Sequence, residues 1–74
     1  MEYKYDKIVG NRIRELREKK YFTQDQMAAK LQVMGCDLTR SAVAKIEVGQ
    51  RHIYLHELKC IREVLNCKYE DLLE

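Results

Sequence analysis

Residues 22–49 have the sequence FTQDQMAAKLQVMGCDLTRSAVAKIEVG, which contains two sets of helical signals with a gap between them. The first set opens with Thr23 and Gln26, which have the spacing of a capping box. In this motif the threonine oxygen accepts a hydrogen bond from the backbone N–H of the third helical residue, and the glutamine side chain reaches back to the cap. We therefore expect a helix to begin at Gln24.

The apolar residues that follow continue this helix. Met27, Ala28 and Leu31 recur at the spacing of one helical face, so they predict an apolar stripe. Residues 33–37 contain the first glycine after that stripe and keep no helical period. We interpret residues 33–37 as a turn.

A second helix is expected over residues 40–48. Thr39 is a favourable N-cap residue, and Val43 and Ile46 share one helical face. Gly49 stands where a helix end favours a residue that tolerates positive φ.

The outer face of this second helix is polar and cationic, because Arg40, Ser41 and Lys45 lie on it. Two short helices joined by a turn, the second with such a face, have the layout of a DNA-binding helix-turn-helix. The sequence therefore predicts a nucleic-acid interface on residues 40–48.

Before this unit, residues 7–19 are expected to form a helix with Val9, Ile13 and Leu16 facing inward. Gly10 weakens such a helix by up to about 1 kcal/mol relative to alanine. A glycine in this place indicates that another helix approaches closely there.

After the unit, further helices are expected over residues 55–65 and 69–73. The first of them lacks a good N-cap, because Tyr54 stands where serine, threonine or aspartate is favoured. Asn66 tolerates a left-handed backbone and is expected to end this helix. The predicted fold class is therefore all-α.

Length and composition describe one small domain. A chain of 74 residues has room for a single modest core, and 46% hydrophobic and 35% charged residues without proline fit a helical globule. We expect residues 7–74 to form the domain and residues 1–6 an N-terminal arm. The sequence has no apolar run near the roughly 20 residues that span a membrane and no signal-peptide pattern, so we expect a cytoplasmic protein.

The cysteines and histidines do not predict a metal site. Cys36, Cys60 and Cys67 are odd in number and form no C-x-x-C pair, so we expect reduced thiols that act as small apolar residues. His52, His56 and Cys60 recur at intervals of four, but no carboxylate completes a metal-binding set. No catalytic triad or glycine-rich phosphate loop is evident either. We expect no metal, no cofactor and no enzyme.

Four runs of the sequence together resemble one known family. They are RIRELR (residues 12–17), TQDQMAAKL (23–31), TRSAVAKIEVG (39–49) and VLNCKYEDLL (64–73). These runs are similar to the phage-repressor helix-turn-helix family, the Cro and lambda-repressor-like proteins also called XRE. The resemblance implies a compact five-helix DNA-binding bundle and the function of a transcriptional regulator.

The sequence departs from the family pattern at two places. Between Leu31 and Leu38 it has about five more residues than the compact family turn. We interpret this excess, around residues 32–37, either as a second helix extended by about a turn or as a longer connector. Tyr21 replaces the glycine that usually ends the first helix. A left-handed backbone costs a non-glycine residue roughly 1–2 kcal/mol, so either the turn differs or strain is accepted.

Base contacts are expected from the N-terminal part of the second helix, because that part of a recognition helix reaches base edges. Arg40 is suited to bind guanine O6 and N7 bidentately, which is worth about 1–3 kcal/mol of discrimination. Lys45 suits guanine or phosphate, and Ala44 offers a methyl group to thymine. By resemblance, the base-facing residues are Arg40, Ser41, Ala44 and Lys45.

Contacts with the DNA backbone are expected around this helix. Basic residues crowd the first helix, which suits either a face turned to phosphate or an ordinary solvated face. The polar loop after Gly49 also suits phosphate contact. The expected backbone-contact residues are Arg12, Thr39, Gln50, Arg51 and His52. The resemblance adds Gln24, at the phosphate-facing start of the helix that begins there. The resemblance further implies a structural ion pair between Arg17 and Glu47.

The function that these expectations describe requires no chemistry: sequence-specific binding of double-stranded DNA and regulation, most often repression, of a promoter. One module of this size offers few base contacts. We therefore expect a homodimer on a palindromic operator with half-sites about 34 Å apart. The alternative is a protein-binding module, an antitoxin or adaptor that uses the same bundle to grip a protein.

Overall fold

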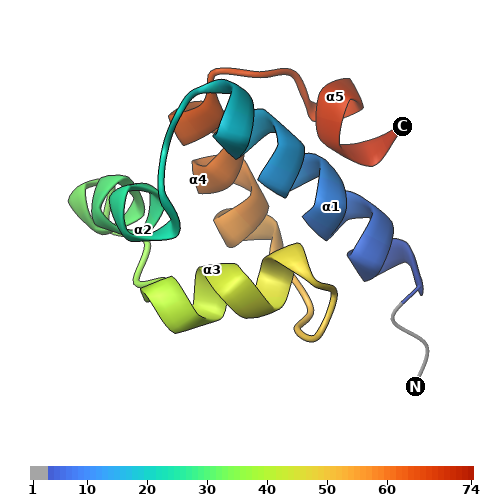
Figure 1. Cartoon of the computed structure of the whole chain (residues 1–74), viewed down its shortest axis with the longest axis horizontal. Helices are drawn as coiled ribbons and strands as arrows, with labels where there is room; N and C mark the ends of the chain where they lie inside the picture. Colours follow the sequence, from blue (N-terminus) through green and yellow to red (C-terminus); the bar gives the residue numbers. More distant parts are fainter. Residues whose placement is uncertain (1–3) are drawn as a thin grey trace.

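The computed structural model describes residues 4–74, and these form five α-helices (Figure 1). The helices are α1 (Lys4–Lys19), α2 (Gln24–Val33), α3 (Arg40–Glu47), α4 (Leu55–Leu65) and α5 (Tyr69–Leu73). The all-α, five-helix architecture expected from the sequence is confirmed. No helix within residues 4–74 is both long enough and apolar enough to cross a membrane.

Helix α1 is the centre of the arrangement. It packs against α3, α4 and α5, while α2 packs against α3 and α4. Figure 1 shows α2 and the start of α3 at one end of the molecule and α5 toward the other. The helix-turn-helix unit therefore lies apart from α5.

The core is built from apolar side chains of all five helices and of the connector between α2 and α3. Val43 and Ile46 face inward from α3, as their spacing predicts. Burial of one such side chain is worth about 1.5–3 kcal/mol, so packing fixes α3 in place. The largest fully buried side chains are those of Ile13, Met27, Leu31, Leu38, Ile46, Ile61, Leu65 and Leu72.

Helix α1 begins earlier than its sequence suggests. It starts at Lys4, so the prediction of an arm that extends through residue 6, with a helix start at Lys7, is wrong for residues 4–6. The remainder of the predicted arm, residues 1–3, lies outside the described residues.

Tertiary contacts explain this early start. The Tyr5 hydroxyl donates a hydrogen bond to the carbonyl oxygen of Leu73 at 2.7 Å. An Asp6 carboxylate oxygen lies 2.6 Å from Nδ1 of His52, and an acid in the first turn also complements the helix dipole. The partners, Leu73 and His52, are distant in sequence from residues 5 and 6, so a local sequence pattern could not predict these contacts.

Helices α1 to α4 all end with a residue of positive φ. After α1, the N–H of Tyr21 donates to the Glu18 carbonyl and the N–H of Phe22 donates to the Arg17 carbonyl, which is a Schellman motif. The predictions for Gly49 and Asn66 are confirmed. The four residues and their φ angles are Tyr21 (60°), Gly35 (83°), Gly49 (76°) and Asn66 (51°).

The extra residues between α2 and α3 form mainly a longer connector. α2 ends at Val33, and residues 34–39 follow without helix. Cys36 and Leu38 of this connector are buried, and Gln32 Nε2 donates to the Leu38 carbonyl oxygen at 3.0 Å. The connector is therefore packed against the domain, and it fixes where α3 begins.

Two glycines allow elements to approach α1 closely. At Gly10, a Cβ atom would lie only 2.0 Å from the carbonyl oxygen of Ile46, so the predicted close approach of another helix is confirmed and the helix is α3. At Gly49, a Cβ atom would lie 2.6 Å from the Cα of Lys7. Any side chain at either position would push α3 or its C-terminal loop away from α1.

Candidate nucleic-acid interface

The start of α3 is set by its N-cap. Thr39 Oγ1 accepts a hydrogen bond from the backbone N–H of Ala42 at 3.1 Å, so the helix begins at Arg40 as predicted. It ends at Glu47, one residue earlier than predicted, because the N–H of the next residue bonds to the Ile46 carbonyl as a cap.

The exposed face of α3 combines cationic, polar and apolar side chains. Arg40, Ser41 and Lys45 are exposed, and Ala44 is half-buried. Val48 caps the helix and is 52% exposed. It follows Ala44 by four residues and so continues the line from Arg40 along this face. Val48 was not among the residues expected from the sequence, although its helical spacing was a sufficient signal.

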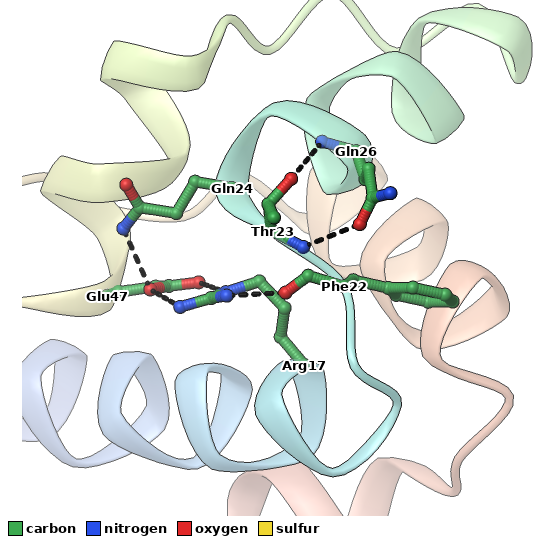
Figure 2. Close-up of polar contacts among 6 residues, drawn as sticks. All are labelled: Arg17, Phe22, Thr23, Gln24, Gln26 and Glu47. Atoms are coloured by element: carbon green, nitrogen blue, oxygen red, sulfur yellow. Dashed lines mark hydrogen bonds and ion pairs between the residues drawn. The ribbon is translucent and has the colours of Figure 1, made fainter.

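The C-terminal end of α3 is held by a buried ion pair (Figure 2). Arg17 Nε donates to Glu47 Oε2 at 2.6 Å, and Nη2 donates to Oε1 at 3.1 Å. Arg17 Nη1 also donates to the carbonyl oxygen of Phe22 at 2.6 Å. The pair implied by the resemblance is present, and its guanidinium joins α1, the turn after α1, and α3.

Gln24 brings the start of α2 to the same carboxylate. Its Nε2 donates to Glu47 Oε1 at 3.1 Å (Figure 2). The predicted capping box is complete, because the Gln26 N–H donates to Thr23 Oγ1 at 3.0 Å and the Thr23 N–H donates to Gln26 Oε1 at 2.8 Å. Three helices therefore meet at Glu47.

The Arg17 and Glu47 side chains of this network are buried together and depend on each other for charge compensation. Hydrogen bonding to Glu47 raises the pKa of Arg17 above its already high ordinary value, so the arginine stays charged. The two parallel hydrogen bonds offset the desolvation cost of both buried charges. Removing one partner of such a pair typically lowers the free energy of unfolding by about 3–5 kcal/mol. The network thus fixes the orientation of α3 relative to α1 and α2.

The sequence profile of the helix-turn-helix family matches residues 13–72, which is most of the chain. The chain belongs to the helix-turn-helix family. This confirms the resemblance found in the sequence. Proteins of this family are DNA-binding regulators and not enzymes. Helix α3 holds the position of the second helix of the motif, which in such proteins enters the major groove.

Two solved structures share this helix-turn-helix fold. The restriction-modification controller protein C.AhdI from Aeromonas hydrophila is 30% identical, with 95% of this chain and 94% of that chain covered and a TM-score of 0.83. The DNA-binding domain of BldD is 20% identical, with both chains covered completely and a TM-score of 0.83. A search of the curated proteins finds no match.

Several residues predicted to contact DNA gather around α3. The four predicted base-contact residues lie on α3 itself, and Thr39 stands at its N-terminal end. Gln24 stands at the start of α2 and is half-buried, while Gln50 is exposed in the loop after α3.

Arg12 projects from α1 toward α5, away from the face of α1 that packs against α3. Its Nη1 donates to the carbonyl oxygen of Leu72 at 3.4 Å, so the guanidinium faces α5. Helix α3 packs at Gly10, and residues two apart point about 200° from each other around a helix. Contact of Arg12 with the DNA backbone remains a prediction, made from a side chain that faces α5.

Arg51 and His52 both contact acidic side chains of helices. Arg51 Nη1 and Nη2 donate to the two carboxylate oxygens of Glu57, both at 2.8 Å, and these bonds lower the pKa of Glu57. His52 Nδ1 contacts Asp6 of α1. Arg51 therefore holds the loop against α4. The expected contacts of Arg51 and His52 with phosphate remain predictions.

The cysteines of the helix-turn-helix domain are free and largely enclosed. Burial, followed by hydrogen bonding with Cys60, raises the pKa of Cys36 to about 11, and burial also raises the pKa of Cys67. The His56 ring stacks on Tyr54, with 6.2 Å between ring centroids. Residues 4–74 contain no group of three histidine, cysteine or acidic side chains placed to hold a metal ion.

Proposed function

We propose that this protein is a cytoplasmic transcriptional repressor that binds a palindromic DNA operator as a homodimer. The observation that carries the proposal is the exposed face of α3, which is fixed from behind by the buried network at Glu47. A rigid recognition helix can hold its side chains at defined base edges. Occupancy of a promoter then suffices for repression.

Arg40 is the principal base-reading residue in this proposal. It stands at the N-terminal end of α3 with its side chain 66% exposed, which suits bidentate binding to guanine in the major groove. Lys45 lies further along the same helix and reaches guanine or phosphate. Ala44 and Val48 offer apolar contact to thymine methyl groups, while Ser41 adds a hydroxyl group.

Contacts with the DNA backbone come from the helix starts and from the loop after α3. The Thr39 oxygen accepts the cap bond, which leaves the hydroxyl hydrogen to donate to a phosphate. Gln24 stands at the start of α2, where the helix dipole favours an anion. Gln50 is the exposed side chain that follows α3. These three contacts would place the recognition helix in its groove.

The dimensions of the domain support a dimer on adjacent half-sites. Half-sites one turn of DNA apart are separated by about 34 Å. The domain measures 31 × 21 × 20 Å, so two copies bound in this way lie close enough to touch.

We place the dimer contact at the surface where α4 begins. Tyr5, Ile53, Leu55, Leu58 and Leu73 line a hollow there, and Leu55 is 85% exposed. We call these five residues the α4-start surface. An exposed apolar surface of this kind is typical of protein interfaces. The α4-start surface follows the loop after α3 in the chain. A two-fold axis through this surface would therefore leave one recognition helix on each side of the axis.

The test is selection of bound sequences from a random duplex library at physiological salt. The unsubstituted protein should enrich an inverted repeat, and Arg40→Ala should lose the preference for one base pair in each half-site. Lys59→Ala removes an exposed cation of α4 and serves as the control, because it should keep the full motif.

Failure to recover any motif would overturn the base-reading proposal. If Arg40→Ala and Lys45→Ala leave binding to a protein partner intact while DNA binding is absent or independent of salt, the chain is an antitoxin or adaptor. The α4-start surface would then be the first place to look for that partner.

A further inference from the structure

Arg40 has a carboxylate neighbour on α2. Its Nε lies 3.6 Å from Oδ1 of Asp25, and the two side chains are 66% and 75% exposed. Asp25 belongs to the first turn of α2, and α2 packs against α3 at the end of the molecule where α3 begins (Figure 1). The pair therefore borders the exposed face of α3.

Protein stability does not account for this pair. An exposed ion pair changes an equilibrium constant by at most about fivefold. The helix dipole favours an acid in the first turn of α2, but that effect involves no contact with Arg40. A carboxylate beside a DNA-binding face also repels phosphate, so Asp25 affects DNA binding as well as folding.

We propose that Asp25 is a specificity-determining residue that acts through Arg40. The inference rests on the proposed function, in which Arg40 binds guanine. Asp25 contacts Arg40 at Nε and so orients the guanidinium group. This contact leaves Nη1 and Nη2 available to donate the two hydrogen bonds to guanine O6 and N7.

The same carboxylate acts against incorrect DNA. On a site without guanine at this position, Arg40 keeps Asp25 as its partner in place of a phosphate, and the charge of Asp25 opposes the DNA backbone. On the correct site, Arg40 contacts the base and Asp25 together. Asp25 therefore weakens non-specific binding more than operator binding, which increases the ratio between them.

The experiment measures the affinity of Asp25→Asn for three duplexes over a range of salt concentrations. They are the selected operator, the same operator with the Arg40-dependent base pair changed, and a random-sequence duplex. We expect binding to the random duplex to tighten about two- to fivefold, with discrimination at the changed base pair reduced by a similar factor. The salt slope on the random duplex should steepen by about one, because Arg40 is released to phosphate.

Asp37→Asn is the matched control, since Asp37 is an exposed carboxylate in the connector just before α3. It makes the same change of charge, so a general charge effect appears equally in both variants. If Asp25→Asn tightens binding to all three duplexes equally, or changes discrimination no more than Asp37→Asn does, the proposal is wrong. An effect of Asp25→Asn on discrimination that persists in an Arg40→Ala background would also overturn it.

These outcomes separate the inference from the proposed function. If the unsubstituted protein selects no sequence, the proposed function fails and the inference fails with it. If the protein selects an operator and Arg40→Ala loses its base pair, but Asp25→Asn keeps full discrimination, only the inference about Asp25 fails.

Discussion

At the scale of single residues, burial divides the charged side chains into two groups. Arg17 and Arg51 each form a bidentate pair with a buried glutamate, and these pairs hold neighbouring elements together. Arg40 and Lys45 are exposed on α3, where their charges are available to DNA. The charge of an arginine is therefore known from the sequence, but whether it forms a buried ion pair or stays exposed is not.

The Arg51–Glu57 pair predicts a loss of stability in acid. Arg51 lowers the pKa of Glu57 in the folded state, so the stabilisation is complete above the ordinary glutamate pKa of about 4.3. It is lost as the pH falls through the lower, folded-state pKa. Urea unfolding measured between about pH 5 and pH 3 should show this decline, and Glu57→Gln should make it shallower.

Glu70→Gln is the control for this pH series, because Glu70 is an exposed carboxylate of α5. It should keep the pH dependence of the unsubstituted protein. Identical pH dependence for Glu57→Gln and the unsubstituted protein would show that the Arg51–Glu57 pair does not contribute to acid stability.

At the scale of secondary structure, α1 to α4 are each followed by a residue of positive φ, and one of these four residues is of a type that disfavours it. Gly35, Gly49 and Asn66 are residue types that accept a left-handed backbone at low cost, and Tyr21 is not. The structure answers the question raised by this departure from the family pattern: the turn is kept and strain is accepted. Tyr21 is 91% exposed, so its ring adds little burial in return.

Replacement of Tyr21 by glycine should therefore stabilise the domain. Relief of roughly 1–2 kcal/mol of strain is offset in part by about 0.5–1 kcal/mol of added chain flexibility. We expect Tyr21→Gly to raise the free energy of unfolding by about 0.5–1 kcal/mol in urea denaturation. Tyr21→Ala removes the ring but keeps the Cβ atom, so it should give little gain. Equal stabilisation by both variants would place the effect in the ring.

At the scale of the whole molecule, the question is where a second copy binds. The large exposed apolar residues include Leu55 at the start of α4 and Val33 at the end of α2. Only Leu55 of these two lines the hollow of the α4-start surface. This difference makes them a matched pair for testing the proposed dimer.

Leu55→Glu should convert the proposed dimer into a monomer, because it introduces a charge into the α4-start surface. The variant should still fold, since an acid at the start of α4 suits the helix dipole. Sedimentation velocity should show the monomer, and apparent operator affinity should fall by about a hundredfold or more as bivalent binding is lost.

Val33→Glu makes the same chemical change at an equally exposed apolar residue and should remain dimeric. Dissociation caused by Val33→Glu, with Leu55→Glu unaffected, would move the dimer contact to the α2 end of the molecule. A monomeric unsubstituted protein at concentrations that saturate the operator would remove the dimer from the proposal.

The candidate site was predictable to the extent that it is local. Thr39 caps α3 and Arg40 begins it as expected, because a cap and the residues it serves are neighbours in the chain. The place of Val48 on the exposed face of α3 could also have been predicted, from its helical spacing after Ala44. The direction of the Arg12 side chain could not, because it depends on an α5 carbonyl 60 residues later in the sequence. The Asp25–Arg40 contact likewise depends on how α2 packs against α3.

Local signals in the sequence predicted the five helices and the N-caps of α2 and α3, and they are the basis for proposing α3 as the recognition helix. Those features rest on hydrogen bonds and apolar spacing within a few residues. The folded structure was needed to show that α1 begins at Lys4 and that Arg51 pairs with Glu57. It also showed that three helices meet at Glu47. These outcomes depend on side chains brought together by packing, and packing is set by the whole core at once.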